Sequence, residues 1–200
     1  MPPDPFDVEA ASRLRSYERR IDRLETLESG VGGGDFVLIE HLTTVAAQSS
    51  VNFTNIPAVH THLFIIYSIA GTATNPELTL NIQINGDGSN NYSFLKRLMF
   101  DDDTQSTSDN TNAIVIAAGQ EGNSDQLHAP GWILIPDYLG TNNEKALRGG
   151  GFAELQGPAL HQNITGGMWK TIDEPIDRLQ FFLGGSLFRA NSTISLYGIN

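Results

Sequence analysis

Residues 77–85, which read ELTLNIQIN, alternate strictly between polar and apolar side chains. The apolar members of this stretch are Leu78, Leu80, Ile82 and Ile84. Successive side chains of an extended chain point to opposite faces, so the apolar residues share one face and the polar residues share the other. This period of two predicts a half-buried β-strand. Because Asn85-Gly86 is a strong signal for a tight turn, we expect a hairpin that leads directly into a strand at residues 92–100.

Eight further segments have short apolar or alternating runs bounded by Gly, Pro, Asn or Asp. They are residues 36–45, 50–56, 60–70, 112–118, 131–139, 146–155, 177–185 and 192–199. No helical patterns are interleaved with them and no repeat period is present, which disfavours a parallel α/β sheet and a propeller. The sequence therefore predicts a mainly β head domain at residues 35–200, built as an antiparallel, jelly-roll-like β-sandwich.

The composition excludes several classes of function. The 200 residues include 23 acidic and 12 basic side chains, so the net charge is −11. Binding to nucleic acid is not expected, because that affinity rests on clustered Lys and Arg. The chain has no cysteine, which excludes disulfides and thiolate chemistry. No stretch approaches the roughly 20 apolar residues of a membrane helix, and the N-terminus lacks the pattern of an export signal, so we expect neither membrane insertion nor export.

Residues 1–34 follow a different pattern. Residues 1–9 are expected to form an extended, proline-rich anchor, residues 10–29 a helix, and residues 30–34 a glycine hinge. Within the helix, apolar side chains recur at the a and d positions of a heptad repeat, and opposite charges occupy the flanking g and e positions. The a and d residues are Leu14, Tyr17, Ile21 and Leu24, and the g and e residues are Arg13, Glu18, Arg20 and Glu25.

This heptad segment resembles the trimerisation motif of short parallel three-stranded coiled coils, with its Arg-apolar-x-x-apolar-Glu block present twice. It therefore predicts a parallel trimeric coiled-coil stalk. A stalk of this length is marginal alone, so the head is expected to trimerise too. The alternative is a surface helix that packs its single apolar stripe on its own domain.

Residues 84–94, INGDGSNNYSF, are dense in Asn, Asp and Gly. As an EF-hand calcium loop the stretch fails at two positions, because Asn90 stands where Gly is needed and Lys96 stands where Glu is needed. A turn between strands is the preferred interpretation, and a calcium site of another type is the alternative. Residues 100–112 are expected to form a solvated loop. The candidates for contact with an ion or a glycan are Asp87, Asn90, Asn91, Asp101, Asp102 and Asp103.

His60 and His62 lie one residue apart at the start of an expected strand, which would place both imidazoles on one face. On a threefold axis, three such pairs could bind one metal ion, while the alternative is a pair at a strand edge or subunit contact. No catalytic triad or carboxylate pair is evident, so neither an enzyme nor a cofactor is expected. Four large aromatic side chains could stack on sugar rings if they are exposed, but most of them are expected in the core. These four are Trp132, Tyr138, Trp169 and Tyr197.

Four segments carry a family resemblance. They are FTNIPAVHTHLFIIYSIAG at residues 53–71, LNIQINGDGSNNYSF at residues 80–94, GWILIPDYLGTNNEKAL at residues 131–147 and STISLYGIN at residues 192–200. Together and in this order they resemble the C-terminal β-domains of virion proteins of tailed bacteriophages, namely fibre, spike and head-decoration proteins. The departures are Ile84, where the family tends to carry Phe, and His60, where Tyr is usual.

The resemblance implies a jelly-roll-like trimeric module that is made in the host cytoplasm and displayed on the surface of a virus particle. On this hypothesis the chain is a non-enzymatic structural homotrimer. Its N-terminal anchor would bind a capsid, neck or tail protein, and its head would face outward, where it could contact a host surface glycan. The alternative is a free carbohydrate-binding, lectin-like module.

Overall fold

The structure is a computed structural model that describes residues 35–73, 77–99, 105–119, 128–154 and 160–200. These residues belong to one compact unit, Asp35–Asn200. The expected anchor, stalk and glycine hinge, and with them all of the predicted trimerisation residues, lie outside the described part of the chain.

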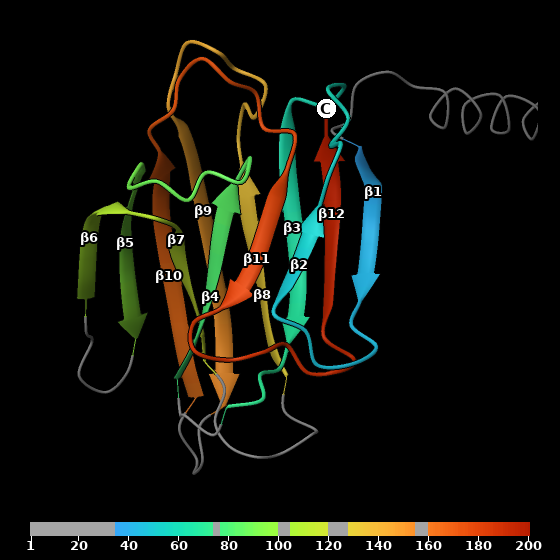
Figure 1. Cartoon of the computed structure of the whole chain (residues 1–200), viewed down its shortest axis with the longest axis vertical. Helices are drawn as coiled ribbons and strands as arrows, with labels where there is room; N and C mark the ends of the chain where they lie inside the picture. Colours follow the sequence, from blue (N-terminus) through green and yellow to red (C-terminus); the bar gives the residue numbers. More distant parts are fainter. Residues whose placement is uncertain (1–34, 74–76, 100–104, 120–127, 155–159) are drawn as a thin grey trace, which may run out of the picture. The chain divides into compact units, whose positions relative to one another are not determined.

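The described residues form twelve β-strands and no helix (Figure 1). The strands are β1 (Phe36–Thr43), β2 (Ser50–Phe53), β3 (His62–Ile69), β4 (Glu77–Ile84), β5 (Tyr92–Met99), β6 (Gln105–Thr111), β7 (Ile114–Gly119), β8 (Ala129–Ile135), β9 (Lys145–Glu154), β10 (Leu160–Trp169), β11 (Leu179–Leu183) and β12 (Thr193–Ile199). All of the strand pairs are antiparallel. The predicted mainly β, antiparallel class is therefore confirmed. In this part of the chain, no helix has the length and apolarity needed to cross a membrane.

The strands form two sheets. The larger has eight strands in the order β1-β12-β3-β8-β9-β10-β5-β6, and the smaller has four in the order β2-β11-β4-β7. The smaller sheet lies in front of the larger one in the view of Figure 1. Buried side chains from both sheets form one hydrophobic core, in which Phe53 of β2 meets Phe181 of β11 edge to face at a centroid distance of 6.0 Å.

The alternation predicted for residues 77–85 is present in β4. Leu80, Ile82 and Ile84 are completely buried, whereas Thr79 and Gln83 on the other face are half-buried. Because β4 lies between β11 and β7 in the smaller sheet, its apolar face supplies the centre of the core.

The expected hairpin between β4 and the next strand is wrong. The turn at Asn85 and Gly86 forms, but β4 pairs with β11 and β7, whereas β5 pairs with β10 and β6 in the other sheet. The loop therefore carries the chain from one sheet to the other. A two-residue hairpin would pair its strands immediately, but here the seven residues of the loop at 85–91 are long enough to cross between the layers.

Two strands were not expected from the sequence. The first is β6, which occupies most of the segment that was predicted to be a solvated loop. Among the described strands it pairs only with β5, at the edge of the larger sheet, where a polar strand needs no buried face. The second is β10, whose apolar alternation is interrupted by Asn163, Thr165 and the pair Gly166-Gly167.

Candidate functional site

The loop at residues 85–91 contains three of the predicted ligand-contact residues, and its first turn is tight. Asn85 and Gly86 have φ angles of 53° and 71°, a left-handed conformation that Gly adopts freely and Asn tolerates better than most residues. The N–H of Asp87 donates to the carbonyl of Ile84 at 2.9 Å and closes the turn. The Asn-Gly pair therefore fixes the direction in which the chain leaves β4.

The Asn85 side chain binds the segment that leads into β11. Its Nδ2 donates to Glu174 Oε1 and to the carbonyl of Pro175, each at 2.8 Å. Its Oδ1 accepts from the backbone N–H groups of Asp177 at 3.0 Å and Arg178 at 3.2 Å. One amide thus satisfies four groups of a neighbouring segment, and the role of Asn85 is structural.

The Asp87 carboxylate connects the same loop to β10. Its Oδ2 accepts from Trp169 Nε1 at 2.8 Å and from Asn91 Nδ2 at 3.0 Å. Its Oδ1 accepts from the N–H of Ser89 at 2.9 Å. Burial alone would raise the pKa of Asp87, but the hydrogen bonds from Trp169, Ser89 and Asn91 outweigh it and hold the pKa below its ordinary value. Both carboxylate oxygens are therefore engaged within the molecule.

The hydroxyl of Tyr92 lies beneath the loop. It accepts from the N–H of Ile84 at 3.0 Å and donates to the carbonyl of Asp87 at 2.9 Å. Tyr92 is completely buried, and this burial raises the pKa of its hydroxyl, so the group stays protonated and can donate. Together Asn85, Asp87 and Tyr92 form a hydrogen-bonded corner that holds β4, β10 and the entry to β11 together.

Replacement of Asp87 by Asn is expected to destabilise the head by about 1–3 kcal/mol at pH 7, because a neutral amide cannot accept from all three donors. Since the pKa of Asp87 is lower in the folded chain, its contribution is complete above its unfolded pKa and is lost as pH falls through the folded value. The difference between wild type and Asp87→Asn in urea unfolding should therefore shrink on acidification below about pH 4. Asp173→Asn, at an exposed position, is the control; an equal effect there would contradict this role of Asp87.

The other predicted contact residues divide into two groups. Asn91 is half-buried and donates to Asp87, whereas Asn90 is exposed at the surface of the loop. Asp101, Asp102 and Asp103 lie outside the described residues. The structure thus brings Asp87 and Asn91 together, but as parts of the hydrogen-bonded corner. Contact of these residues with a glycan or an ion stays a prediction.

His60 and His62 do not continue one strand face, because β3 begins only at His62. The ring of His60 packs over Gly198 and its Nδ1 lies 2.8 Å from Asn200 Oδ1. His62 Nδ1 accepts from the N–H of Asp137 at 3.0 Å. Each imidazole has a separate partner. Among the described residues, no group of three or more His, Cys, Asp or Glu side chains is placed to hold a metal ion.

Two of the four predicted core aromatics, Tyr138 and Trp169, are buried as expected. The other two, Trp132 and Tyr197, lie on the outer face of the larger sheet, which faces away from the core. Together with Phe36 and Phe64 they form an aromatic patch. Phe36 meets Phe64 edge to face at 5.4 Å, and Phe64 stacks with Trp132 at 6.3 Å. Phe36 is 59% exposed. The patch spans β1, β12, β3 and β8.

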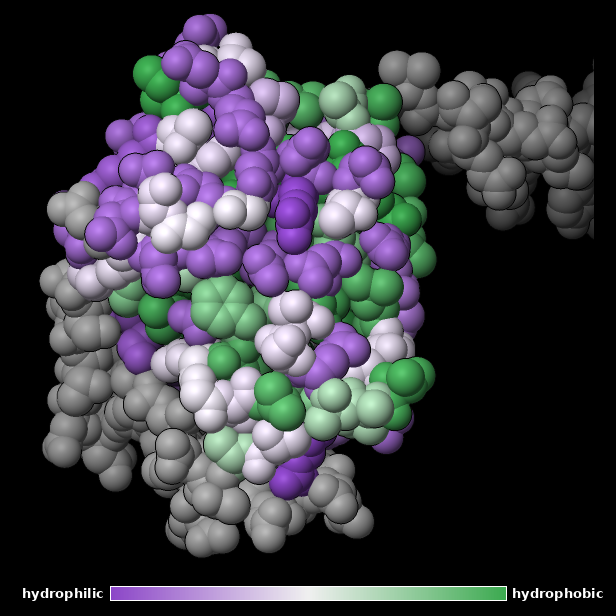
Figure 2. Space-filling model, viewed as in Figure 1, coloured by the Kyte–Doolittle hydropathy of each residue, from purple (hydrophilic) through white to green (hydrophobic). Residues whose placement is uncertain are grey.

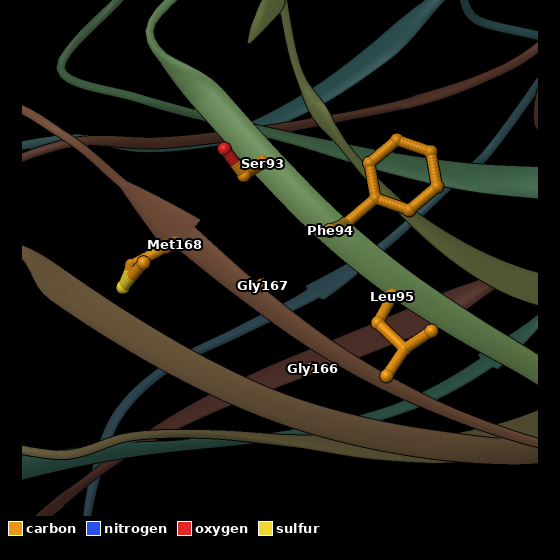
Figure 3. Close-up of a pocket in the computed structure, with 6 residues that line it drawn as sticks. All are labelled: Ser93, Phe94, Leu95, Gly166, Gly167 and Met168. Carbon is orange, nitrogen blue, oxygen red and sulfur yellow. The ribbon is translucent and has the colours of Figure 1, made fainter. Parts of the chain in front are cut away.

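The same outer face has an apolar hollow of about 350 Å³ between β5 and β10. We call it the glycine groove; its lining residues are Ser93, Phe94, Leu95, Gly166, Gly167 and Met168. Figure 3 shows the two glycines on β10 with Leu95 and Met168 on either side of them. Leu95 and Met168 are 44% and 39% exposed. A Cβ at Gly166 would meet no atom within 4 Å, so the floor of the groove is open toward the outside.

The sequence signal for the outer face lies in strands that are apolar on both faces. The strand β3 reads HLFIIYSI, and Phe64 and Ile66 point outward between the buried Leu63, Ile65 and Tyr67. A nearly continuous apolar run is the signal of a strand that is covered on both faces. That signal was available in the sequence.

Comparisons with known proteins give no further guide to this site. No family model, curated protein or solved structure matches the chain.

Proposed function

We propose that this chain is a structural protein of a tailed-bacteriophage particle, a homotrimer that is anchored through residues 1–9, joined by a coiled-coil stalk at residues 10–29 and a glycine hinge, and displays a jelly-roll head. It acts by assembly and display on the virion surface and not by catalysis. The anchor binds a capsid, neck or tail protein. Host adhesion through the head is a secondary role.

The observation that carries this proposal is the strand order. A jelly roll has eight strands, and its two sheets follow the chain order first-eighth-third-sixth and second-seventh-fourth-fifth. When the hairpin-like pairs β5-β6 and β9-β10 are set aside, the remaining strands have the orders β1-β12-β3-β8 and β2-β11-β4-β7. These correspond strand by strand to the jelly-roll order. Jelly rolls are common in viral capsid domains and in lectins.

A free lectin-like module is the second candidate, because the same architecture is found in lectins and exposed aromatic side chains can stack on sugar rings. The outer face favours assembly over sugar binding. Its apolar residues extend over both halves of the larger sheet, which is more than one sugar-binding site needs, and monomeric proteins seldom expose large contiguous apolar patches.

The test of the virion role is to look for the protein on intact particles. Purified phage particles should contain the chain in a constant number of copies in multiples of three, and labelling with an antibody against the head should locate it on one part of the particle. A glycan array probed with the full chain is the second arm. Binding to glycans by a protein that is missing from purified particles would favour the lectin and contradict the proposal.

Replacement of Ile21 by Asp tests the stalk. At an a position of a parallel trimer this change places three carboxylates in one apolar layer, where unpaired charge is strongly unfavourable. The variant is expected to dissociate at protein concentrations at which the wild-type chain stays trimeric, as measured by sedimentation equilibrium. Ser16→Asp, at an outward heptad position, is the control and should leave the mass unchanged. Equal masses for wild type and Ile21→Asp across a dilution series would contradict the stalk.

A further inference from the structure

The two sheets differ in the polarity of their outer faces. On the smaller sheet the outward side chains include Asn52 of β2 and Gln180 of β11, and the near face in Figure 2 is largely hydrophilic in its upper part, with apolar residues gathered along the border where β1 lies. On the larger sheet the corresponding positions of β3 are Phe64 and Ile66, and Ile66 is 46% exposed. An antiparallel sheet with one face in water normally carries polar residues there. The larger sheet therefore has the composition of a sheet with something packed against it.

The aromatic patch projects from one half of this face. Cross-strand pairing places Tyr197 beside Phe64, and Phe64 beside Leu134. Trp132 lies over Gly150, whose added Cβ would be 3.5 Å from the indole nitrogen. The rings are held by one another and by the sheet below, so little side-chain entropy remains to be lost on contact with a partner.

The glycine groove lies on the other half of the same face. The register places Gly166 beside both Arg148 and Leu95, in the row that begins with Tyr197, Phe64 and Leu134. Projection and hollow are therefore level with each other along the strands and are separated by β9. They are different surfaces of one protomer.

Rotational symmetry distinguishes the possible self-contacts. A twofold dimer joins one patch to the same patch of its partner, whereas a closed ring of three joins two different patches. On the basis of the trimer proposed above, we propose that the aromatic patch of one copy packs into the glycine groove of the next copy, so that the outer faces of the three large sheets form the subunit interface of the head. The occupant of the apolar face is thus a second copy of this chain.

The position of β1 agrees with this arrangement. Phe36, the first residue of β1, belongs to the aromatic patch and follows the predicted coil, which ends at residue 29, by seven residues. An extended chain of that length spans at most about 25 Å. A threefold coil would therefore deliver three aromatic patches within a short distance of one axis, which raises their effective concentration for each other.

Gly166→Phe tests the groove without removing any existing contact. Since a Cβ at this position meets nothing within 4 Å, the head should fold normally, but the phenyl ring would fill the groove. The concentration at which half of the trimer dissociates is expected to rise at least about tenfold. Asn52→Phe, which adds the same ring to the outer face of the smaller sheet, should leave it unchanged. Equal dissociation of the two variants would overturn the assignment of the groove.

A cross-linking experiment locates the contact. Because the chain has no cysteine, Ser68→Cys provides a single attachment point for a short photoreactive label on β3, at the rim of the aromatic patch. In the full chain, mixed with isotopically labelled copies, the label is expected to join β5 or β10 of another copy. Ser50→Cys, an equally conservative change on β2 of the smaller sheet, is the control and should give no link between copies.

The outcomes separate this inference from the proposed function. If the chain is trimeric but the label joins residues 10–29, or gives no link between copies, the face-to-groove contact is overturned while the trimer stands. If the full chain is monomeric, the trimer and the contact both fail. A link from the label at position 68 to β3 of another copy would indicate a twofold contact and would also overturn the inference.

Discussion

Replacement of Gly131 by Ala is expected to destabilise the head by about 3 kcal/mol, which is at the upper end for a single added methyl group. Gly131 in β8 pairs with Tyr67 in β3, and the buried phenol ring lies where the new Cβ would be. That Cβ would also lie 2.6 Å from the carbonyl oxygen of Gly150. Neither group can move easily, because Gly150 is part of the β8–β9 ladder and Tyr67 is enclosed in the core and donates to Gly150.

Urea unfolding of Gly131→Ala, followed by tryptophan fluorescence, measures this effect. The matched control is Gly166→Ala, in the same sheet, where the added Cβ meets nothing within 4 Å and the change should stay within about 0.5 kcal/mol. If the two variants were equally stable, the close contact between the Tyr67 ring and Gly131 would be contradicted.

Replacement of Asn85 by Ala is expected to cost about 2–4 kcal/mol. The change removes the amide that binds four groups of residues 174–178, each hydrogen bond being worth about 1 kcal/mol. It also places a residue with a Cβ and no compensating polar side chain at a φ of 53°.

Two further variants separate these causes in the same unfolding measurement. Asn85→Gly keeps the backbone freedom and loses only the hydrogen bonds, so it should be less destabilised than Asn85→Ala by about 1 kcal/mol. Asn90→Ala, at an exposed position in the same loop, should change the stability by less than about 0.5 kcal/mol. A cost at Asn90 as large as that at Asn85 would show that the corner is not organised by the Asn85 amide.

Most of the fold was predictable from short apolar runs and their boundaries. The strands that alternate or carry apolar runs, such as β4 and β12, were expected at nearly the bounds observed. The exceptions have physical causes. The polar strand β6 is an edge strand that buries little, and β10 carries its Gly pair because Gly167 packs against Ile114, whose Cγ2 would lie 2.5 Å from an added Cβ. Neither requirement produces a local apolar pattern.

The partners of β4 and β5 were not predictable from local sequence. Asn85-Gly86 specifies the tight turn but not whether the following strand returns to the same sheet. That choice depends on contacts far along the chain, including those of Asn85 with Pro175 and of Asp87 with Trp169. The turn was therefore expected at the right place in the sequence, but the strands on either side of it were wrongly expected to pair as a hairpin.

The outer face of the larger sheet shows the opposite situation. Its signal was present in the sequence, because β3 has apolar residues at both its odd and its even positions. The pairs β9-β10 and β5-β6 extend the larger sheet beyond β1-β12-β3-β8 and add the glycine groove to it. The groove depends on two strands that meet only in the folded chain, so no local pattern indicates it.

The most direct test of the central claim is the mass of the full chain in solution. One chain has a mass of 21.8 kDa, and three times 21.8 kDa is about 65 kDa. Light scattering during size-exclusion chromatography is expected to give about 65 kDa, unchanged on moderate dilution. A mass of 21.8 kDa would contradict both the trimeric stalk and the subunit interface assigned to the larger sheet.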